Sequence, residues 1–221
     1  MLGIALTLER SGTSLAQVDT VDLIRRLSAN ARKLDRLLTD LLDLDRLSRG
    51  IVAPKRRPTD VAALVSRMAA EWTLLNGREL QLDVEPAMVS IDPGKVERIV
   101  ENLLANAAKH TPPDAPVWLG VRRHGDRDGD GVLLIVEDAG AGVPPELRAS
   151  VFEPFRQGPE SPAHTPGVGI GLTLVARFAA LHGGRAWVDD REGGGSSFKV
   201  LLPGSPEQRP EPQRESEPAP S

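Results

Sequence analysis

The stretch that decides the fold is Glu101-Asn-Leu-Leu-Ala-Asn-Ala-Ala-Lys-His110. Asn102, Asn106 and Lys109 recur at spacings of four and three, so a helix would place them on one face and its leucines and alanines on another. Asparagine is a poor helix former, which makes two of them in an apolar helix a costly choice. Amide oxygens suit Mg²⁺ and a lysine suits phosphate. The stretch alone leaves a solvated helix face and a nucleotide site both open.

Around this stretch the chain alternates between helical and strand patterns. Asp92-Pro93 is typical of a helix start, with the aspartate as cap and the proline in the first turn. We expect another helix from Pro58-Thr59-Asp60 to about Leu74, and a third over 169–181. Strands are expected at 79–84, 88–91, 117–123, 132–137, 185–189 and 196–202, the last two joined by Gly193-Gly194-Gly195. Antiparallel hairpins beside long helices predict a two-layer α+β sandwich rather than a βαβ repeat.

Two glycine-rich motifs lie next to groups that could bind a ligand: a carboxylate in one case and the start of a helix in the other. Asp138-Ala-Gly140-Ala-Gly142 follows an apolar strand, where a carboxylate can accept from an exocyclic amine and glycines let backbone approach a flat ring. An ordinary glycine turn is the alternative. Gly167-Val-Gly169-Ile-Gly171-Leu172 leads into a helix, whose free amides would form an anion site. Its spacing is not that of the dinucleotide motif, and no strand precedes it.

The segment between these motifs has the composition of a lid. Residues 158–166 are polar and rich in Pro, Gly and Ser, which is typical of a mobile loop. Before it stands Val151-Phe-Glu-Pro-Phe-Arg156. We expect Phe152 and Phe155 to form a small satellite core that anchors one end of the lid, with Arg156 facing phosphate or solvent.

The first fifty residues are helical in pattern. Leucines recur at spacings of three and four, at positions 23, 27, 34, 37, 38, 41, 44 and 47. We expect a cap at Asp19 or Thr20, an end at Gly50, and the tail of a preceding helix in Met1–Glu9. The stripe is too broad for one neighbour, so the sequence predicts a helical hairpin that dimerises into a four-helix bundle. A hairpin packed on its own domain is the alternative.

Composition narrows the function classes. The 221 residues carry 27 Lys and Arg against 31 Asp and Glu, a net charge of −4, which provides no overall attraction to nucleic acid. The lack of cysteine excludes disulfides, thiolate nucleophiles and Cys-ligated metals. No apolar run is long enough to span a membrane, and we expect a cytoplasmic location. Residues 204–221 lack large apolar side chains and are expected to be disordered.

Taken in order, the motifs resemble those of two-component sensor histidine kinases, within the Bergerat-type ATPases. Residues 102–110 resemble the N box, 138–142 the G1 box, 152–155 the F box, 167–172 the G2 box, and Gly193–Phe198 the last glycine block. The resemblance implies a truncated dimerisation hairpin over 1–50 and a catalytic ATP-binding domain over 51–203. It also implies ATP and Mg²⁺ as cofactors and a response regulator receiver domain as partner.

The resemblance also implies roles for individual residues. Asn106 would ligate Mg²⁺ with support from Asn102, Lys109 and His110 would contact phosphate, and Asp138 would accept from the adenine amino group. The remaining residues implied at the ATP site are Gly140, Gly142, Phe155, Arg156, Gly167, Gly169, Gly171, Leu172 and Ser196. Where related hydrolases carry a general-base glutamate, this chain has Asn102, and Glu101 lies about 100° round the helix. This favours phosphoryl transfer to a side chain over steady hydrolysis.

One family feature is missing from the sequence. The four histidines, at 110, 124, 164 and 182, do not stand where the family carries its phosphoacceptor. We therefore expect ATP–Mg²⁺ binding without autophosphorylation of this chain, which would be the later part of a longer kinase or would phosphorylate a His-bearing dimerisation domain in trans. A non-catalytic nucleotide-binding module and an anti-sigma-type serine kinase remain alternatives.

Overall fold

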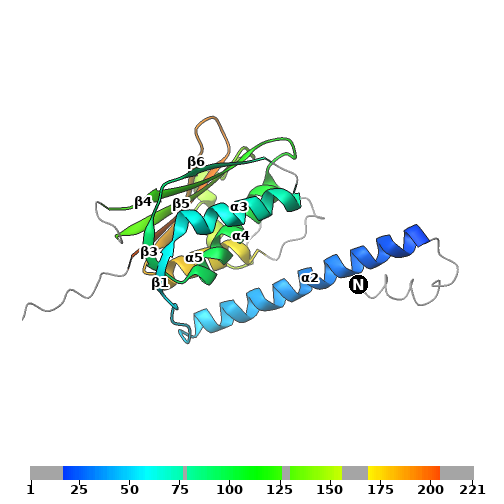
Figure 1. The fold of residues 1–221 in the computed structure, drawn as a ribbon, viewed down its shortest axis with the longest axis horizontal. Helices are drawn as coiled ribbons and strands as arrows, with labels where there is room; N and C mark the ends of the chain where they lie inside the picture. The colour runs from blue at the N-terminus through cyan, green and yellow to red at the C-terminus, as the bar shows by residue number, and fades with distance from the viewer. Residues whose placement is uncertain (1–16, 77–78, 126–129, 156–168, 205–221) are drawn as a thin grey trace, which may run out of the picture.

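The computed structural model describes residues 17–76, 79–125, 130–155 and 169–204. Helices and strands alternate along the chain (Figure 1). In chain order they are α2 (Gln17–Ser48), β1 (Arg57–Asp60), α3 (Val61–Asn76), β2 (Leu80–Val84), β3 (Met88–Ile91), α4 (Pro93–His110), β4 (Val117–Arg123), β5 (Gly131–Asp138), the 3-10 helices η1 (Pro145–Leu147) and η2 (Ser150–Phe152), α5 (Gly171–Leu181), β6 (Arg185–Asp190) and β7 (Ser196–Pro203).

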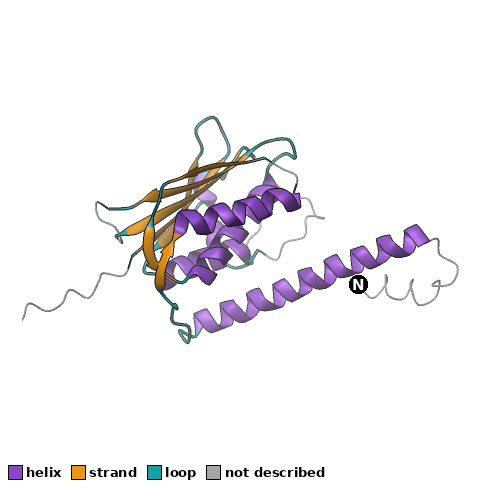
Figure 2. Cartoon of the chain, in the orientation of Figure 1, coloured by secondary structure: helices purple, strands orange, loops and turns teal. Residues whose placement is uncertain are grey.

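A five-stranded sheet forms one layer of an α/β sandwich. Its strands lie in the order β2-β4-β5-β7-β6, and every neighbouring pair is antiparallel except β2 and β4, which run parallel. Helices α3, α4 and α5 cover one face of the sheet (Figure 2). The expected α+β sandwich is confirmed, although the parallel pair makes the sheet mixed rather than built from hairpins alone.

The core lies between the sheet and these three helices. Along β5, Val132, Leu134 and Val136 are buried and alternate with half-buried residues, which is the period of a strand with one face inward. Helix α4 buries a stripe at helical spacing, consisting of Val96, Ile99, Val100, Leu103, Leu104 and Ala107. This stripe fixes the rotation of α4, so its asparagines lie beside the buried face rather than on it.

The strand β1 corrects one expectation. Residues 58–60 do not open a helix but pair with β3 in a separate two-stranded antiparallel sheet. Helix α3 begins afterwards, at Val61, and the Asp60 Oδ1 atom accepts a hydrogen bond from the Ala63 N–H at 3.1 Å. The Pro-Thr-Asp sequence therefore does supply a helix cap, but only its aspartate takes part.

Helix α2 is a single long helix beside the sandwich (Figure 1). It begins at Gln17, before both Asp19 and Thr20, so the expectation that one of them caps it is wrong. The expected stop at Gly50 is confirmed: the helix ends at Ser48, and Gly50 just beyond it has φ of 66°, a left-handed conformation that glycine adopts without strain.

Some expectations fall on residues that the structure does not describe. These are the preceding helix over Met1–Glu9, the lid over 158–166, and the tail beyond Gly204. Among the described helices, none combines the length and the hydropathy that crossing a membrane requires.

Candidate functional site

The candidate site is built around α4. The Asp92 Oδ1 atom caps this helix by accepting from the Lys95 N–H at 3.2 Å, and Pro93 occupies the first turn. The C-terminal half then presents Asn102 and Asn106, both half-buried, followed by Lys109 and His110, both exposed. The predicted helix and the shared placement of these polar residues beside its apolar face are confirmed.

Asn102 lies against the beginning of α5. Its Nδ2 atom donates to the Arg98 carbonyl one turn earlier, at 2.8 Å. A Cβ atom placed on Gly171 would stand 2.9 Å from the Asn102 Oδ1 atom, closer than real Cβ contacts allow. Only glycine at position 171 lets the amide of Asn102 approach the first turn of α5 in this way.

No side chain of the described residues caps the N-terminus of α5. The residue at its cap position is Ile170, which offers no side-chain acceptor to the first-turn N–H groups. Thr173, in the same turn, is buried, and its hydroxyl has no hydrogen-bond partner among the described residues. Uncapped N–H groups and the helix dipole favour a negatively charged group here.

A second group of residues gathers around Asp138, the last residue of β5. This carboxylate is buried and accepts from the Gly140 N–H at 2.8 Å, and Ser196 also donates to it from its backbone and its hydroxyl. A Cβ atom added to Gly140 would stand only 2.5 Å from the His110 carbonyl oxygen, so position 140 has no room for a side chain. The end of α4, the G1-type loop and the start of β7 thus meet at one point.

Burial sets the titration behaviour of this group. It raises the pKa of Asp138 above the ordinary aspartate value, against the opposing hydrogen bonds from Gly140 and Ser196 and the charge of His110. The side chain of His110 is exposed as a whole, but partial desolvation of its ring lowers the pKa, with the positive charge of Lys109 adding to the effect and Asp138 opposing it. The result is a desolvated acceptor beside a largely neutral imidazole, an arrangement suited to a neutral hydrogen-bond donor such as an aromatic amine.

Helix α4 joins the two groups. Eight residues separate Asn102 from His110, which corresponds to about 12 Å along the helix axis. One end offers the free amides of α5, and the other offers a buried carboxylate. The arrangement can therefore hold an elongated molecule that is anionic at one end and carries a hydrogen-bond donor at the other.

The glycines near Asp138 allow close backbone packing. Gly195 has φ of 99°, and a Cβ there would stand 1.9 Å from the Asp138 carbonyl. Gly142, with φ of 80°, packs against the Gly195 carbonyl. An open cavity of about 370 Å³ borders this contact and is lined by Gly142, Arg148 and Asp190 among others, but not by Asp138 or Asn106. We therefore place it beside the candidate site rather than within it.

A divalent cation would find few carboxylates in this region. Within the described part of the chain no three His, Cys, Asp or Glu side chains cluster as metal ligands do. The amide oxygen of half-buried Asn106 stands one turn from Asn102, on the same side of α4. A single amide oxygen fits Mg²⁺ held mainly by water and phosphate oxygens, which is its usual mode.

The two phenylalanines before the lid segment differ in their surroundings. Phe152 packs edge-to-face on Phe198, with ring centroids 6.4 Å apart. Phe155 is 63% exposed and holds φ of 63°, a left-handed conformation that is rare for a bulky residue. Its N–H donates to the Gly169 carbonyl at 3.1 Å. The expected satellite core is therefore not formed: Phe152 packs against the main core, and the Phe155 ring is exposed.

Some of the remaining predicted site residues lie in or beside α5, and others lie outside the described residues. Leu172 is half-buried and packs against the core, and Gly169 has φ of 73° just before α5. Arg156 and Gly167 lie outside the described residues. Glu101 points away from Asn102 and forms an ion pair with Arg98 at 3.0 Å, as its position on the helix predicted.

One set of contacts near α4 was not predicted from the sequence. Arg98 pairs with Asp40 of α2, and Lys95 pairs with Asp43 of the same helix. The only available signal was the spacing of like charges: the two aspartates are three residues apart on α2, and the two cations are three residues apart on α4. Contacts between elements more than fifty residues apart leave no local pattern.

Comparison with known proteins agrees with this geometry. Residues 91–206 match the family model described as histidine kinase-, DNA gyrase B-, and HSP90-like ATPase. The match runs from the end of β3 to just beyond β7, and so contains every residue of the candidate site.

Similar individual proteins and structures are histidine kinases. The signal transduction histidine-protein kinase/phosphatase MprB of Mycobacterium avium is 34% identical over 205 residues, covering 90% of this chain and 38% of the relative. Full-length ShkA, solved in complex with AMPPNP, superposes with a TM-score of 0.69 at 28% identity over 88% of this chain and 40% of that one. Acinetobacter baumannii histidine kinase AdeS, at 18% identity and TM-score 0.71, covers 93% of both chains and shares the fold. The chain spans only 12% to 38% of three curated relatives.

Proposed function

Because this chain belongs to the histidine kinase-, DNA gyrase B- and HSP90-like ATPases and contains the catalytic domain of a two-component sensor histidine kinase, we propose that it binds ATP with Mg²⁺ and transfers the γ-phosphoryl group to a histidine. That histidine would lie outside the four that this chain carries. From it the phosphoryl group would pass to the receiver domain of a response regulator.

The observation that carries the proposal is the meeting of Asp138, Gly140, His110 and Ser196 at one end of α4 while Asn102 meets the start of α5 at the other. In the proposal, Asp138 accepts from the adenine amino group, and Gly140 and Gly142 flank the base. The phosphates extend along α4 past Lys109 toward Asn102 and the amides of α5.

The metal would be held mainly by the nucleotide. We assign Asn106 as its protein ligand, because this residue offers an amide oxygen on the side of α4 that leads to α5. Bound Mg²⁺ would neutralise charge on the phosphates during transfer. The protein's share of the work is positioning: Asn102 rests on α5, and Lys109 and the helix amides balance the remaining negative charge.

Transfer is favoured over hydrolysis by what surrounds Asn102. An amide cannot remove a proton from water, and the neighbouring carboxylate, Glu101, is exposed and paired with Arg98. His182 is a poor acceptor because it is buried and both ring nitrogens are in hydrogen-bond contact. An acceptor histidine supplied by a helical dimerisation domain fits these facts.

Partner contacts belong on α2. Val21, Ile24, Leu34, Leu38, Leu41 and Leu42 are exposed large apolar residues of this helix. In the proposal, this stripe packs against a second copy or another His-bearing helical domain in a four-helix bundle.

The test has two parts. Calorimetric titration with ATP should detect binding that weakens when Mg²⁺ is withheld and that is on the order of 100-fold weaker in an Asp138→Asn variant. The chain is then incubated with γ-labelled ATP, alone and with a separate His-bearing dimerisation domain. Acid-labile label on the added domain alone supports the proposal. Strong acid-labile label on the chain itself contradicts it, acid-stable label indicates a serine kinase, and binding without any label indicates a regulatory module.

A further inference from the structure

Helix α2 packs one face against the sandwich and exposes apolar residues on the opposite face. Asp40 is buried, and Leu44 and Leu47 pack against the core of the sandwich. At 100° per residue these positions share one face, whereas Leu38 and Leu42 fall on the opposite one and are 56% and 48% exposed. Part of the expected leucine stripe, Leu44 and Leu47, therefore contacts the sandwich, whereas the face that carries Leu38 and Leu42 does not. That exposed face can be covered while the sandwich remains in place.

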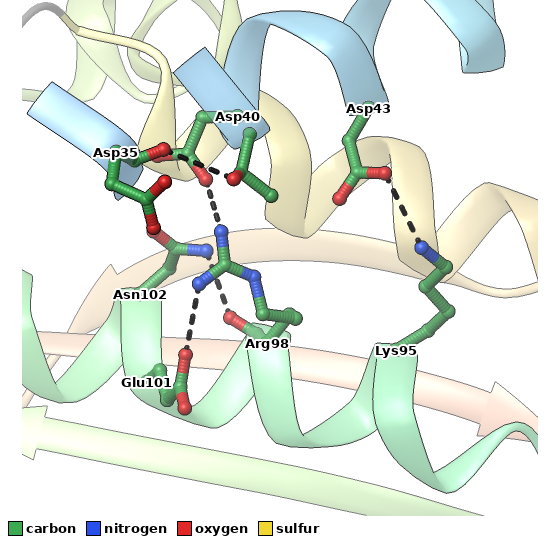
Figure 3. Close-up of polar contacts among 8 residues, drawn as sticks. Asp35, Asp40, Asp43, Lys95, Arg98, Glu101 and Asn102 are labelled. Atoms are coloured by element: carbon green, nitrogen blue, oxygen red, sulfur yellow. Dashed lines mark hydrogen bonds and ion pairs between the residues drawn. The ribbon is translucent and has the colours of Figure 1, made fainter. Parts of the chain in front are cut away.

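The contacting face carries two negative charges that match two positive charges on α4. Asp40 pairs with Arg98, and the Asp43 Oδ1 atom stands 3.5 Å from the Lys95 Nζ atom (Figure 3). Both aspartates and both cations are three residues apart, so the pairs lie side by side one turn apart on each helix. A shift of one turn along α2 would leave at most one carboxylate opposite one cation, so both pairs form together only in the observed register.

These pairs are better shielded from water than the other ion pairs of α2. The exposed fractions of the side chains are 8% for Asp40, 17% for Asp43 and 23% for each cation, against 52% and 65% in the Asp45–Arg49 pair. Lys95 also lies 4.8 Å from the centroid of the Phe178 ring of α5. Partly desolvated pairs interact more strongly than exposed ones, and separating one leaves a charge without compensation.

A second set of bonds holds the chain after α2. The Lys55 N–H donates to the Asp92 Oδ2 atom at 2.8 Å, and the Arg56 guanidinium donates to the His182 carbonyl at 2.8 Å. Residues 50–54 lie between these anchors and α2, and Ile51 among them is 71% exposed. If α2 leaves the sandwich, these five residues are where the chain can bend.

We propose that the Asp40–Arg98 and Asp43–Lys95 pairs form a charge-matched latch, which docks the sandwich on α2 in one register and opens as a unit by bending at residues 50–54. Opening removes both carboxylates from the first half of α4, the helix that carries Asn102 and Asn106 further on. The latch does not require nucleotide chemistry, so it can stand or fall independently of the function proposed above.

The absence of native cysteine makes a distance measurement straightforward. Spin labels on cysteines introduced at exposed Arg25 of α2 and exposed Glu71 of α3 report the separation of the two bodies by pulsed electron resonance. The otherwise unaltered chain should give one narrow distribution at low salt that broadens as NaCl rises, because salt screens the pairs. Arg98→Glu should broaden it at every salt concentration, raising the undocked population on the order of tenfold. Asp45→Lys, on the same helix but outside the latch, is the control and should leave it narrow.

Charge exchange decides whether the matching itself matters. Asp43→Lys combined with Lys95→Asp should restore the narrow distribution that either single change loses. The milder Asp43→Asn and Lys95→Gln variants make the same test if a reversed charge prevents folding, which circular dichroism reports. A narrow distribution in Arg98→Glu, or equal broadening in the exchange and in its single variants, would overturn the latch and leave Leu44 and Leu47 as the docking contacts.

Discussion

The Asp92 N–H donates to the Nε2 atom of His182 at 3.0 Å, which ties the beginning of α4 to the end of α5. The other ring nitrogen, Nδ1, lies 2.7 Å from the Phe178 carbonyl and must carry the proton, since a carbonyl can only accept. The imidazole is therefore neutral in this arrangement. Protonation of Nε2 would place two donors face to face in a buried site.

The first prediction concerns stability below neutral pH. Burial is the main cause that lowers the pKa of His182 below 6.5, with Arg56 contributing and Phe178 and Asp92 opposing. Below pH 6.5 the unfolded chain takes up a proton that the folded chain refuses, so stability is complete above that pH and falls as pH falls toward the folded pKa. The free energy of unfolding should decrease by up to about 1.4 kcal/mol per pH unit between pH 6.5 and 5.5, as measured by urea denaturation.

Its controls separate His182 from the other histidines. His182→Gln should lower stability at pH 7.5 and flatten the pH dependence, whereas His124→Gln at an exposed position should change neither. His110 has a lowered pKa as well, so His110→Gln should remove a further part of the slope. An unchanged slope in His182→Gln would show that the ring is not the titrating group.

The second prediction uses the contact between Gly171 and Asn102. Gly171→Ala adds a Cβ that must displace the Asn102 amide, because the two atoms would stand 2.9 Å apart. Nucleotide affinity should fall about tenfold, while alanine's helix propensity offsets some loss of stability. Gly94→Ala, whose Cβ would meet its nearest neighbour at an ordinary 3.6 Å, is the matched control and should retain affinity. Calorimetry and thermal unfolding measure the two effects separately.

The third prediction separates binding from folding at Asp138. Burial raises the pKa of this carboxyl, which means that its charge is disfavoured by the fold. Asp138→Asn should therefore change the free energy of unfolding by less than about 1 kcal/mol while weakening nucleotide binding on the order of 100-fold. The reverse pattern, intact binding with lost stability, would assign Asp138 a structural role. Asp189→Asn, on the outer face of the sheet, should leave affinity unchanged.

The fourth prediction concerns strain at Phe155. Its φ of 63° is easily adopted by glycine, and its ring is mostly exposed. Phe155→Gly should therefore raise the free energy of unfolding by about 1 kcal/mol. Phe152→Ala, which removes the edge-to-face contact with Phe198, should lower it. A destabilised Phe155→Gly variant would mean that the ring makes contacts that its exposure does not suggest.

Local patterns predicted most of the sandwich. The cap and proline at Asp92-Pro93, the apolar run over 132–136 and the glycines at 193–195 each indicate an element from neighbouring residues alone, and the helix, the strand and the hairpin are confirmed. Strand β1 was missed because Pro58 and Asp60 resemble a helix start, while its pairing partner lies thirty residues away in β3. The parallel pairing of β2 with β4 is equally non-local.

The candidate site was predictable to a similar degree. Asn102, Asp138 and Gly171 were singled out by residue type and position, but their neighbours depend on tertiary contacts. No pattern in the sequence indicated that Gly171 would face Asn102, or that Phe155 would be exposed while Phe152 packs. The ion pairs from Asp40 and Asp43 to α4 belong to the same class of long-range contact.

The last prediction concerns the leucine stripe of α2. Leu38 and Leu41 are exposed in a single chain, so Leu38→Glu should leave the free energy of unfolding of the sandwich nearly unchanged. If a second copy covers the stripe, the same change buries a charge in the interface and should raise the dimer dissociation constant at least tenfold. Thr39→Glu adds the same charge beside the stripe and should have a smaller effect. Sedimentation equilibrium measures both constants, and equal values for Leu38→Glu and the unaltered chain would remove the stripe from the dimer.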